Sequence, residues 1–200
     1  MLTQDQKDAL QEITNIGMGQ AGASIARVLD EFVHLSVPRI TLLSPHEMHQ
    51  ALKQSVGEGP VTAVRQAFHS QMRGEALVLF GEDRCRDLAD LMGYEDAELD
   101  RGSEVEILLD VTNLLVGACL AGIAEQLGAH IGFSAPSLMA DRVPTAELLT
   151  SSELPWNMAL LVEVQFRLEQ RSFASHLLLL MPEEEIQVMC TALDDFLANM

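Results

Sequence analysis

A repeat at a spacing of 98 residues limits how this 200-residue chain can fold more than any other feature of its sequence. The residues that recur are of four types with special roles: an acidic residue, an asparagine, a glycine and a proline. The matching pairs are Glu12 with Asp110, Asn15 with Asn113, Gly19 with Gly117, and Pro38 with Pro136. The sequence therefore predicts a duplicated unit of about 100 residues, roughly 1–98 and 99–200. Because no stretch rich in Pro, Gly or Ser separates the halves, we expect them to share the core of a single domain.

Each half predicts the same order of elements: a long helix, short strands, a variable piece, two longer strands and a final helix. Thr3 followed by Gln6 forms a capping-box pattern, so the first helix is expected to start there and to run to about Glu31. The other expected elements are strands near 33–43 interrupted by Pro38, a short helix over 45–56, hairpins of 60–69 with 73–80 and of 157–168 with 172–181, and acidic helices over 82–93 and 182–198. Because hairpins pair their strands antiparallel, the expected class is α+β with a mostly antiparallel sheet.

The charge balance argues against several classes of partner. The chain has 30 acidic and 12 basic residues, a formal charge of −18, which argues against nucleic acid and against an anionic membrane surface. The first residues are polar and lack the apolar core of a signal peptide, and the longest apolar stretch, 111–124, is too short to cross a bilayer. Three scattered cysteines, Cys85, Cys119 and Cys190, indicate reduced thiols. We therefore expect a soluble, cytoplasmic protein.

Polar residues form one stripe along each long helix. On a helical wheel Asp8, Glu12 and Asn15 fall within about 60° of one another, and Gly19 continues the stripe one turn later. The stripe of the second long helix consists of Ser103, Glu106, Asp110, Asn113 and Gly117. The face of the first helix that is expected to pack inward consists of Leu10, Ile13, Gly17, Ala21, Ser24 and Val28. Each helix thus presents a carboxylate and an amide three residues apart on its outer face.

The glycines in these stripes favour a docking face over ordinary solvated surface. Glycine inside a helix costs about 1 kcal/mol relative to alanine, so Gly19 and Gly117 need a compensating role. Bare backbone beside the carboxylate and the amide would let the surface of a partner approach closely. Glu and Asn on a single helix are usually just solvated, but their repetition in step with glycine and proline favours function.

At these residues the sequence resembles the CheC, CheX and FliY family of chemotaxis phosphatases. The signature of that family is Asp or Ser, three residues, Glu, two residues, Asn, twenty-two residues and Pro. The first copy, Asp8, Glu12, Asn15 and Pro38, matches it completely. The second copy, Glu106, Asp110, Asn113 and Pro136, keeps the spacing with Asp in place of Glu. The resemblance covers essentially the whole chain in two units, and it implies a CheC-like fold of pseudo-twofold symmetry with two long helices packed on a long sheet.

The resemblance also implies hydrolysis of the aspartyl phosphate on a CheY-like receiver domain. The resemblance implies that Asn15 and Asn113 position the attacking water. It implies that Glu12 pairs with the lysine of the receiver, and Asp110 takes the place of Glu12 in the second site. The expected binding residues are Asp8, Gly19, Glu106 and Gly117. No cofactor of its own is expected, and any Mg²⁺ would belong to the receiver, because the stripe has too few oxygen ligands to hold one.

The second site is expected to be the weaker of the two. Asp110 is one methylene shorter than Glu, and a misplacement of about 1 Å can cost on the order of 10²-fold in rate. We therefore expect the site of Asn15 to be the more active one.

Two other interpretations stay open at this stage. The middle domain of the flagellar switch protein FliM is similar in fold and works by assembly without the Glu-x-x-Asn pairs, so a non-catalytic module that binds a receiver or the flagellar switch is the alternative function. Some CheC relatives bind a CheD-like deamidase, and such a partner is also open here.

Other patterns carry less weight. Residues 17–22 satisfy GxGxxG but lack the hydrophobic strand that precedes a dinucleotide-binding turn. His46 and His49 resemble a fragment of a zinc-protease motif without a third ligand at a recognisable spacing. We therefore expect neither a nucleotide site nor a metal site.

Overall fold

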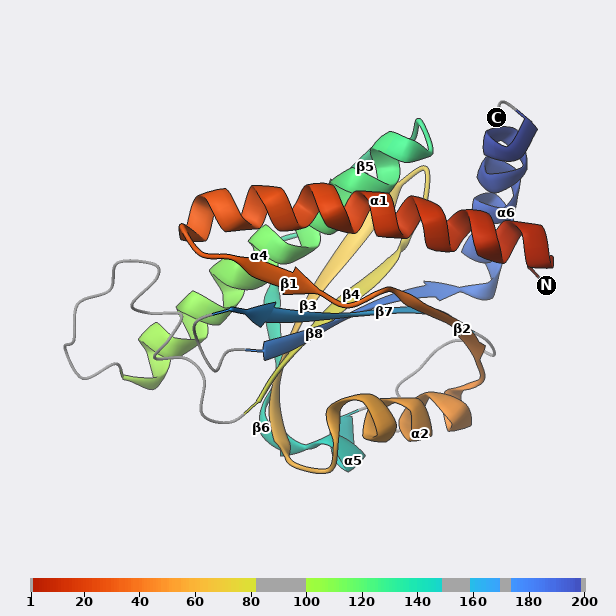
Figure 1. Cartoon of the computed structure of the whole chain (residues 1–200). Coiled ribbons are helices and arrows are strands. Elements are labelled where there is room, and N and C mark those ends of the chain that lie inside the picture. The colour runs from red at the N-terminus through yellow and green to blue at the C-terminus, as the bar shows by residue number, and fades with distance from the viewer. Residues whose placement is uncertain (1, 82–99, 149–158, 170–173, 199–200) are drawn as a thin grey trace.

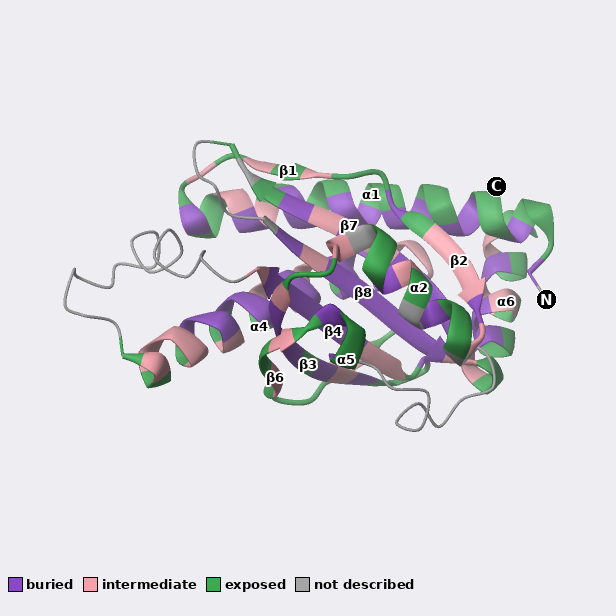
Figure 2. Cartoon of the chain, turned by 90° about the horizontal axis from the view of Figure 1, so that it is seen from below, coloured by how far each residue is buried: buried purple, intermediate pink, exposed green. Residues whose placement is uncertain are grey.

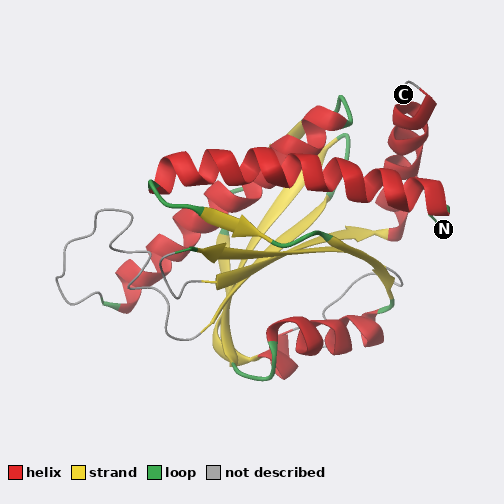
Figure 3. Cartoon of the chain, in the orientation of Figure 1, coloured by secondary structure: helices red, strands yellow, loops and turns green. Residues whose placement is uncertain are grey.

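The computed structural model describes residues 2–81, 100–148, 159–169 and 174–198, and it shows an α+β fold (Figure 1). The described strands form one eight-stranded sheet with helices on both of its faces (Figure 3). The elements in chain order are α1 (Gln4–Leu29), β1 (Val33–Leu35), β2 (Arg39–Leu43), α2 (Pro45–Val56), β3 (Pro60–Ser70), β4 (Gly74–Gly81), α4 (Arg101–Gln126), β5 (Ile131–Phe133), β6 (Ser137–Pro144), α5 (Thr145–Leu148), β7 (Ala159–Leu168), β8 (Ala174–Pro182) and α6 (Glu183–Ala198). Every strand pairing in the described residues is antiparallel, so the expected class is confirmed.

The start of α1 has the capping box that the sequence predicts. The Gln6 N–H donates to Thr3 Oγ1 at 3.2 Å, and the Thr3 N–H donates to Gln6 Oε1 at 2.9 Å. The helix ends at Leu29, short of the expected Glu31, because Asp30 adopts a left-handed conformation with φ of 50°.

The remaining predicted elements are found close to their expected places. Pro38 separates β1 from β2, α2 covers 45–56, and both hairpins form. The C-terminal acidic helix is α6. The acidic helix expected over 82–93 lies outside the described residues.

The order of the strands reads the same from either edge of the sheet. It is β1-β7-β8-β4-β3-β5, with β2 also paired to β7 and β6 also paired to β3. Each strand has a counterpart in the other half: β1 with β5, β2 with β6, β3 with β7 and β4 with β8. If every strand is replaced by its counterpart, the same order results when the sheet is read from the opposite edge. The short strands of each half thus complete the hairpin of the other half, so the described part of neither half forms its portion of the sheet alone.

Two apolar clusters pack on opposite faces of the sheet. The larger cluster lies under α1, α4 and α6, and the smaller lies under α2 and α5. Along β8, Leu177 and Leu179 belong to the larger cluster, whereas Leu178 and Leu180 belong to the smaller. Figure 2 shows the resulting burial along β8 in purple. A strand covered on both faces needs such an unbroken apolar run in place of alternation.

The helices α1 and α4 touch at two glycines. A Cβ atom at Gly17 would lie 2.8 Å from the carbonyl carbon of Gly122, and one at Gly122 would lie 2.6 Å from the carbonyl oxygen of Gly17. The GxGxxG pattern of 17–22 therefore lies inside a helix, where its first glycine permits close packing. Its last glycine, Gly22, faces Leu35, whose Cδ1 would lie 3.1 Å from an added Cβ.

The buried face of α1 is wider than the sequence predicts and shifted around the helix. Val28 was expected to pack inward but is 64% exposed, and Ser24 is only half-buried. Thr14 and Met18 are buried instead. Because α1 packs against α4 as well as against the sheet, two adjacent rows of side chains are covered, and Val28 lies on neither.

The helix α4 extends well beyond the apolar stretch 111–124, and by length and composition it could cross a membrane. In this fold 61% of its most apolar segment is buried. Ile107, Val111 and Val116, for example, belong to the larger apolar cluster. The helix is therefore part of the core of the fold.

Candidate functional site

The first polar stripe lies on the outer face of α1, as predicted. Glu12 and Asn15 are exposed, whereas Ile13 and Thr14 between them are fully buried. The helix is continuous through these residues. Side chains three positions apart on a helix have their Cβ atoms about 5–6 Å apart, so the carboxylate and the amide are presented side by side.

The second stripe has the same arrangement on α4. Glu106, Asp110 and Asn113 are exposed, and Ser103 at the start of the stripe is half-buried. The Ser103 N–H and hydroxyl donate to Oδ1 of Asp100 at 2.8 and 3.0 Å, which caps the helix. These hydrogen bonds, the backbone one first, hold the pKa of Asp100 below its usual value.

Both stripes include open backbone beside the carboxylate and the amide. A Cβ atom at Gly19 or Gly117 would have no heavy atom within 4 Å. The packing of the described residues therefore does not require glycine at either position. Asp8, the first residue of the signature, is exposed and accepts a hydrogen bond from Gln4 Nε2 at 2.8 Å.

A serine that precedes each signature proline ties its segment to the sheet in the same way. The Ser36 N–H donates to the carbonyl oxygen of Gln165 and the Gln165 N–H donates to Ser36 Oγ, both at 2.9 Å. The Ser134 N–H donates to the carbonyl oxygen of Ala67 at 2.9 Å, and the Ala67 N–H donates to Ser134 Oγ at 3.0 Å. The Ser-x-Pro pattern is present in both halves of the sequence. These mirrored contacts establish that Gln165 corresponds to Ala67.

Asn113 has a partner that the sequence analysis missed. Its Oδ1 accepts a hydrogen bond of 2.9 Å from Nε2 of Gln66, which lies on β3 and is 1% exposed. Gln66 belongs to the first half of the chain and Asn113 to the second, so no local pattern connects them. The corresponding residue under the first site is Val164, whose apolar side chain is buried.

The first motif is also where the chain matches a known family. Residues 6–42 match the model of the CheC-like family, and this range contains Glu12, Asn15 and Pro38. The flagellar motor switch phosphatase FliY of Bacillus subtilis (strain 168) is 22% identical over 161 residues, or 74% of this chain. Both matches support the resemblance of this chain to the CheC/CheX/FliY family. The chain spans 41% of the length of that FliY.

Solved structures of family members and of FliM share this fold. FliY of Thermotoga maritima aligns with a TM-score of 0.72 at 20% identity, over 98% of this chain and 99% of that chain. The FliM–SpeE complex from H. pylori contains a chain that aligns with a TM-score of 0.67 at 8% identity, over 98% of this chain and 97% of that chain. At such identities the likeness concerns the fold alone, so the function has to be argued from the site.

A charged cluster lies at the N-terminal end of the second stripe. Arg101 donates to both carboxylate oxygens of Asp141 on β6, the Nε contact being 3.0 Å, and also to Glu104. Arg142 Nη2 donates to the same Glu104 carboxylate at 3.2 Å. Such partly exposed ion pairs contribute at most about 1 kcal/mol each. Together they hold the start of α4 against β6.

The described residues contain no group of three or more His, Cys, Asp or Glu side chains that could hold a metal ion. Glu47, which lies between His46 and His49 in the sequence, caps α2. Its Oε2 accepts from the Ser44 hydroxyl at 2.6 Å and from the Ser44 N–H at 2.8 Å. These two hydrogen bonds lower the pKa of Glu47.

The two cysteines in the described residues lie apart from the stripes. Burial raises the pKa of the Cys119 thiol far above its usual value, and burial is also the main cause of the raised pKa of Cys190. Neither thiol therefore has the lowered pKa of a nucleophile. Cys85 lies outside the described residues.

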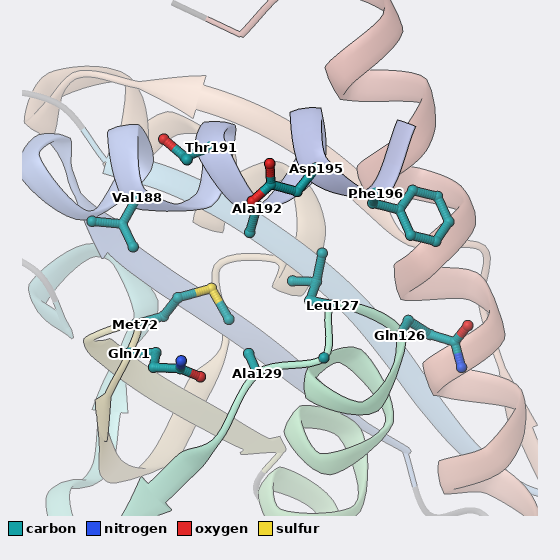
Figure 4. A pocket seen from close by; sticks show the side chains of 11 residues that line it. Gln71, Met72, Gln126, Leu127, Ala129, Val188, Thr191, Ala192, Asp195 and Phe196 are labelled. Carbon is teal, nitrogen blue, oxygen red and sulfur yellow. The ribbon is translucent and has the colours of Figure 1, made fainter. Parts of the chain in front are cut away.

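A hollow of about 660 Å³ lies away from both stripes, between α6, the end of α4 and the turn after β3 (Figure 4). Its lining includes the apolar side chains of Met72, Leu127 and Val188. No residue of the two signature motifs lines it. The candidate site is therefore an exposed ridge on each helix, which suits a protein surface better than a small molecule.

Proposed function

We propose that this chain hydrolyses the aspartyl phosphate of a CheY-like receiver domain at two sites, Glu12 with Asn15 and Asp110 with Asn113. The observation that carries the proposal is the exposure of both carboxylate–amide pairs on continuous helices, each beside an open glycine. A relative in the family is a flagellar motor switch phosphatase, which agrees with this reaction class.

The chemistry needs positioning more than it needs a nucleophile. An acyl phosphate is already activated, so the slow step requires a water molecule held in line with phosphorus. The amide of Asn15 or Asn113 has N–H groups that can donate to a phosphoryl oxygen and a carbonyl oxygen that can accept from this water. The phosphorus–oxygen bond to the aspartyl group then breaks, and inorganic phosphate and the free carboxylate of the receiver are formed.

The carboxylates hold the receiver in place. Glu12 is exposed next to Asn15 and can form an ion pair with a lysine beside the phosphoryl group of the receiver. In this proposal any Mg²⁺ is bound by the receiver, and the chain contributes no cofactor. The matching residue, Asp110, has a shorter reach, so the site of Asn15 is proposed to be the more active of the two.

The test is the decay of a phosphorylated receiver from the same genome, with and without this protein. The wild-type protein is expected to accelerate the loss of phosphate, and a variant with both Asn15→Ala and Asn113→Ala is expected to lose that acceleration. Gln54→Ala, on the exposed part of α2 at the other face of the sheet, serves as the control. Equal decay with and without the wild-type protein would remove the proposal.

A non-catalytic binding module is the alternative function. It is favoured by the likeness of the fold to the FliM middle domain from H. pylori, which extends over 96% of this chain. In that case the protein would bind the receiver or a component of the flagellar switch without changing the lifetime of the phosphoryl group. A pull-down with phosphorylated and unphosphorylated receivers measures binding separately from turnover, and inclusion of a CheD-like deamidase tests that partner.

The proposed place of action is the bacterial cytoplasm, near the receptors or the flagellar motor. The acidic composition agrees with a protein partner in place of nucleic acid or an anionic membrane surface. Imaging of a fluorescent fusion would test this location.

A further inference from the structure

One buried amide connects the sheet to the second site. Gln66 lies on β3 between Val64 and Phe68, which belong to the apolar cluster under the long helices. Its Nε2 lies 2.9 Å from Oδ1 of Asn113 and 2.9 Å from the carbonyl oxygen of Ser134. The two N–H groups of this amide are thus directed at two acceptors, one of them in the candidate site.

The backbone carbonyl of Ser134 decides how both amides are oriented. A carbonyl oxygen can only accept a hydrogen bond, so the nitrogen of Gln66 must be the atom that faces Ser134. The same nitrogen faces Asn113, and Asn113 must therefore turn its Oδ1 toward Gln66. The Nδ2 group of Asn113 then points away from Gln66, and the second lone pair of Oδ1 can still accept from the attacking water.

The other half of the fold has no glutamine at the matching position. Val164 occupies the corresponding position on β7, as the mirrored contacts of Ser36 and Ser134 establish, and it is 0% exposed in the same apolar cluster. Gln66 is also an expensive residue to bury, because its Oε1 has no hydrogen-bond partner among the described residues. A costly buried amide, where the matching position holds valine, points to a role at Asn113.

We propose that Gln66 is a positioning residue that holds the Asn113 amide with its Nδ2 group turned outward, toward the phosphoryl oxygens of a docked receiver. The effect on turnover rests on the proposed phosphatase function, whereas the orientation of the Asn113 amide by Gln66 does not. The donated hydrogen bond also polarises the Asn113 amide, which makes its N–H groups better donors. The two sites therefore differ in two ways: the first has the longer carboxylate, Glu12, and the second has the ordered amide.

The test separates the hold on Asn113 from catalysis. Gln66→Met keeps the approximate shape of the side chain and removes the donor. The first readout is ¹⁵N relaxation of the side-chain amides of the full chain, with signals assigned by Asn15→Ala and Asn113→Ala. In the wild-type protein the order parameter of the Asn113 amide is expected to exceed that of the Asn15 amide. Gln66→Met should lower it toward that of Asn15, and an unchanged Asn113 order parameter would overturn the inference whatever the activity.

The second readout is receiver dephosphorylation with one site active at a time. With Asn15→Ala, only the second site remains, and Gln66→Met should lower its kcat about three- to tenfold, the loss that one hydrogen bond accounts for, with little change in KM. With Asn113→Ala, only the first site remains, and Gln66→Met should leave its kcat unchanged. Equal losses in both backgrounds would indicate a general structural defect and would overturn the positioning role. If neither background dephosphorylates the receiver, the proposed function fails while the relaxation result still decides the hold on Asn113.

Discussion

The backbones of Gly17 and Gly122 are in direct contact where α1 crosses α4. An added Cβ atom on either residue would lie within 2.8 Å of the backbone of the other helix. Neither helix can move away easily, because both also pack on the same face of the sheet. This crossing holds the two helices that carry the candidate sites at a fixed separation.

Gly17→Ala and Gly122→Ala are therefore expected to destabilise the fold by about 1–3 kcal/mol, the usual cost of overpacking. Gly19→Ala is the matched control on α1. Its Cβ would meet no atom within 4 Å, and alanine is the better helix former, so it should raise the free energy of unfolding by up to about 1 kcal/mol. Urea unfolding of the three variants measures this order. A Gly17→Ala protein as stable as Gly19→Ala would show that the helices do not cross so closely.

The two asparagines are expected to contribute unequally to turnover. Asn15→Ala should remove most of the acceleration of receiver dephosphorylation, on the order of 10²-fold at its own site, because the amide both donates to the phosphoryl group and positions the water. Asn113→Ala should have the smaller effect on the total rate. The initial rate of phosphate loss measures both variants, and abolition of turnover by Asn113→Ala alone would reverse the ranking.

The length of the carboxylate side chain is expected to set the activity of each site. With Asn15→Ala as background, Asp110→Glu should raise the rate of the second site about tenfold, because the added methylene extends the reach toward the lysine of the receiver by about 1 Å. The reciprocal change, Glu12→Asp with Asn113→Ala, should lower the rate of the first site by a similar factor. An Asp110→Glu variant slower than its parent would mean that the receiver approaches the second helix more closely.

Cys119 is expected to make stability depend on pH under alkaline conditions. Burial raises the pKa of its thiol in the folded protein, so the folded protein keeps this thiol protonated where the unfolded chain ionises it. The protonated thiol makes its full contribution to the free energy of unfolding below about pH 8.5, the ordinary thiol pKa. Above that pH the free energy of unfolding falls by up to about 1.4 kcal/mol per pH unit. Denaturant unfolding between about pH 7 and 10 gives the free energy of unfolding of the wild type and of Cys119→Ala, and the wild type should lose more of it as the pH rises. Parallel slopes for the two proteins would contradict this assignment.

The same burial predicts the chemical behaviour of the thiol. Cys119 should resist alkylation in the folded protein and react on unfolding, since the thiolate is the reactive form. Cys190 is only half-buried and should react sooner. Mass spectrometry of peptides after timed alkylation distinguishes the two residues.

Features that depend on nearby residues could be predicted from the sequence. Three features depend on residues close together in the sequence: the capping box of Thr3 and Gln6, the break at Pro38, and the exposed pair of Glu12 and Asn15. Periodicity reports which side of an isolated helix is polar, and here the polar side is indeed the exposed one. It failed for Val28, because the width of the buried face depends on how α4 lies against α1.

The sequence by itself determined the α+β class, the antiparallel hairpins and the two ridges of carboxylate and amide side chains, because these follow from local periodicity, turn chemistry and a repeated spacing. Only the tertiary structure decided that Gly17 lies against Gly122 and that Gln66 lies under Asn113 and not under Asn15. Both contacts join residues from different halves of the chain. These contacts form because the strands of each half complete the sheet of the other half, and no local sequence pattern contains that pairing.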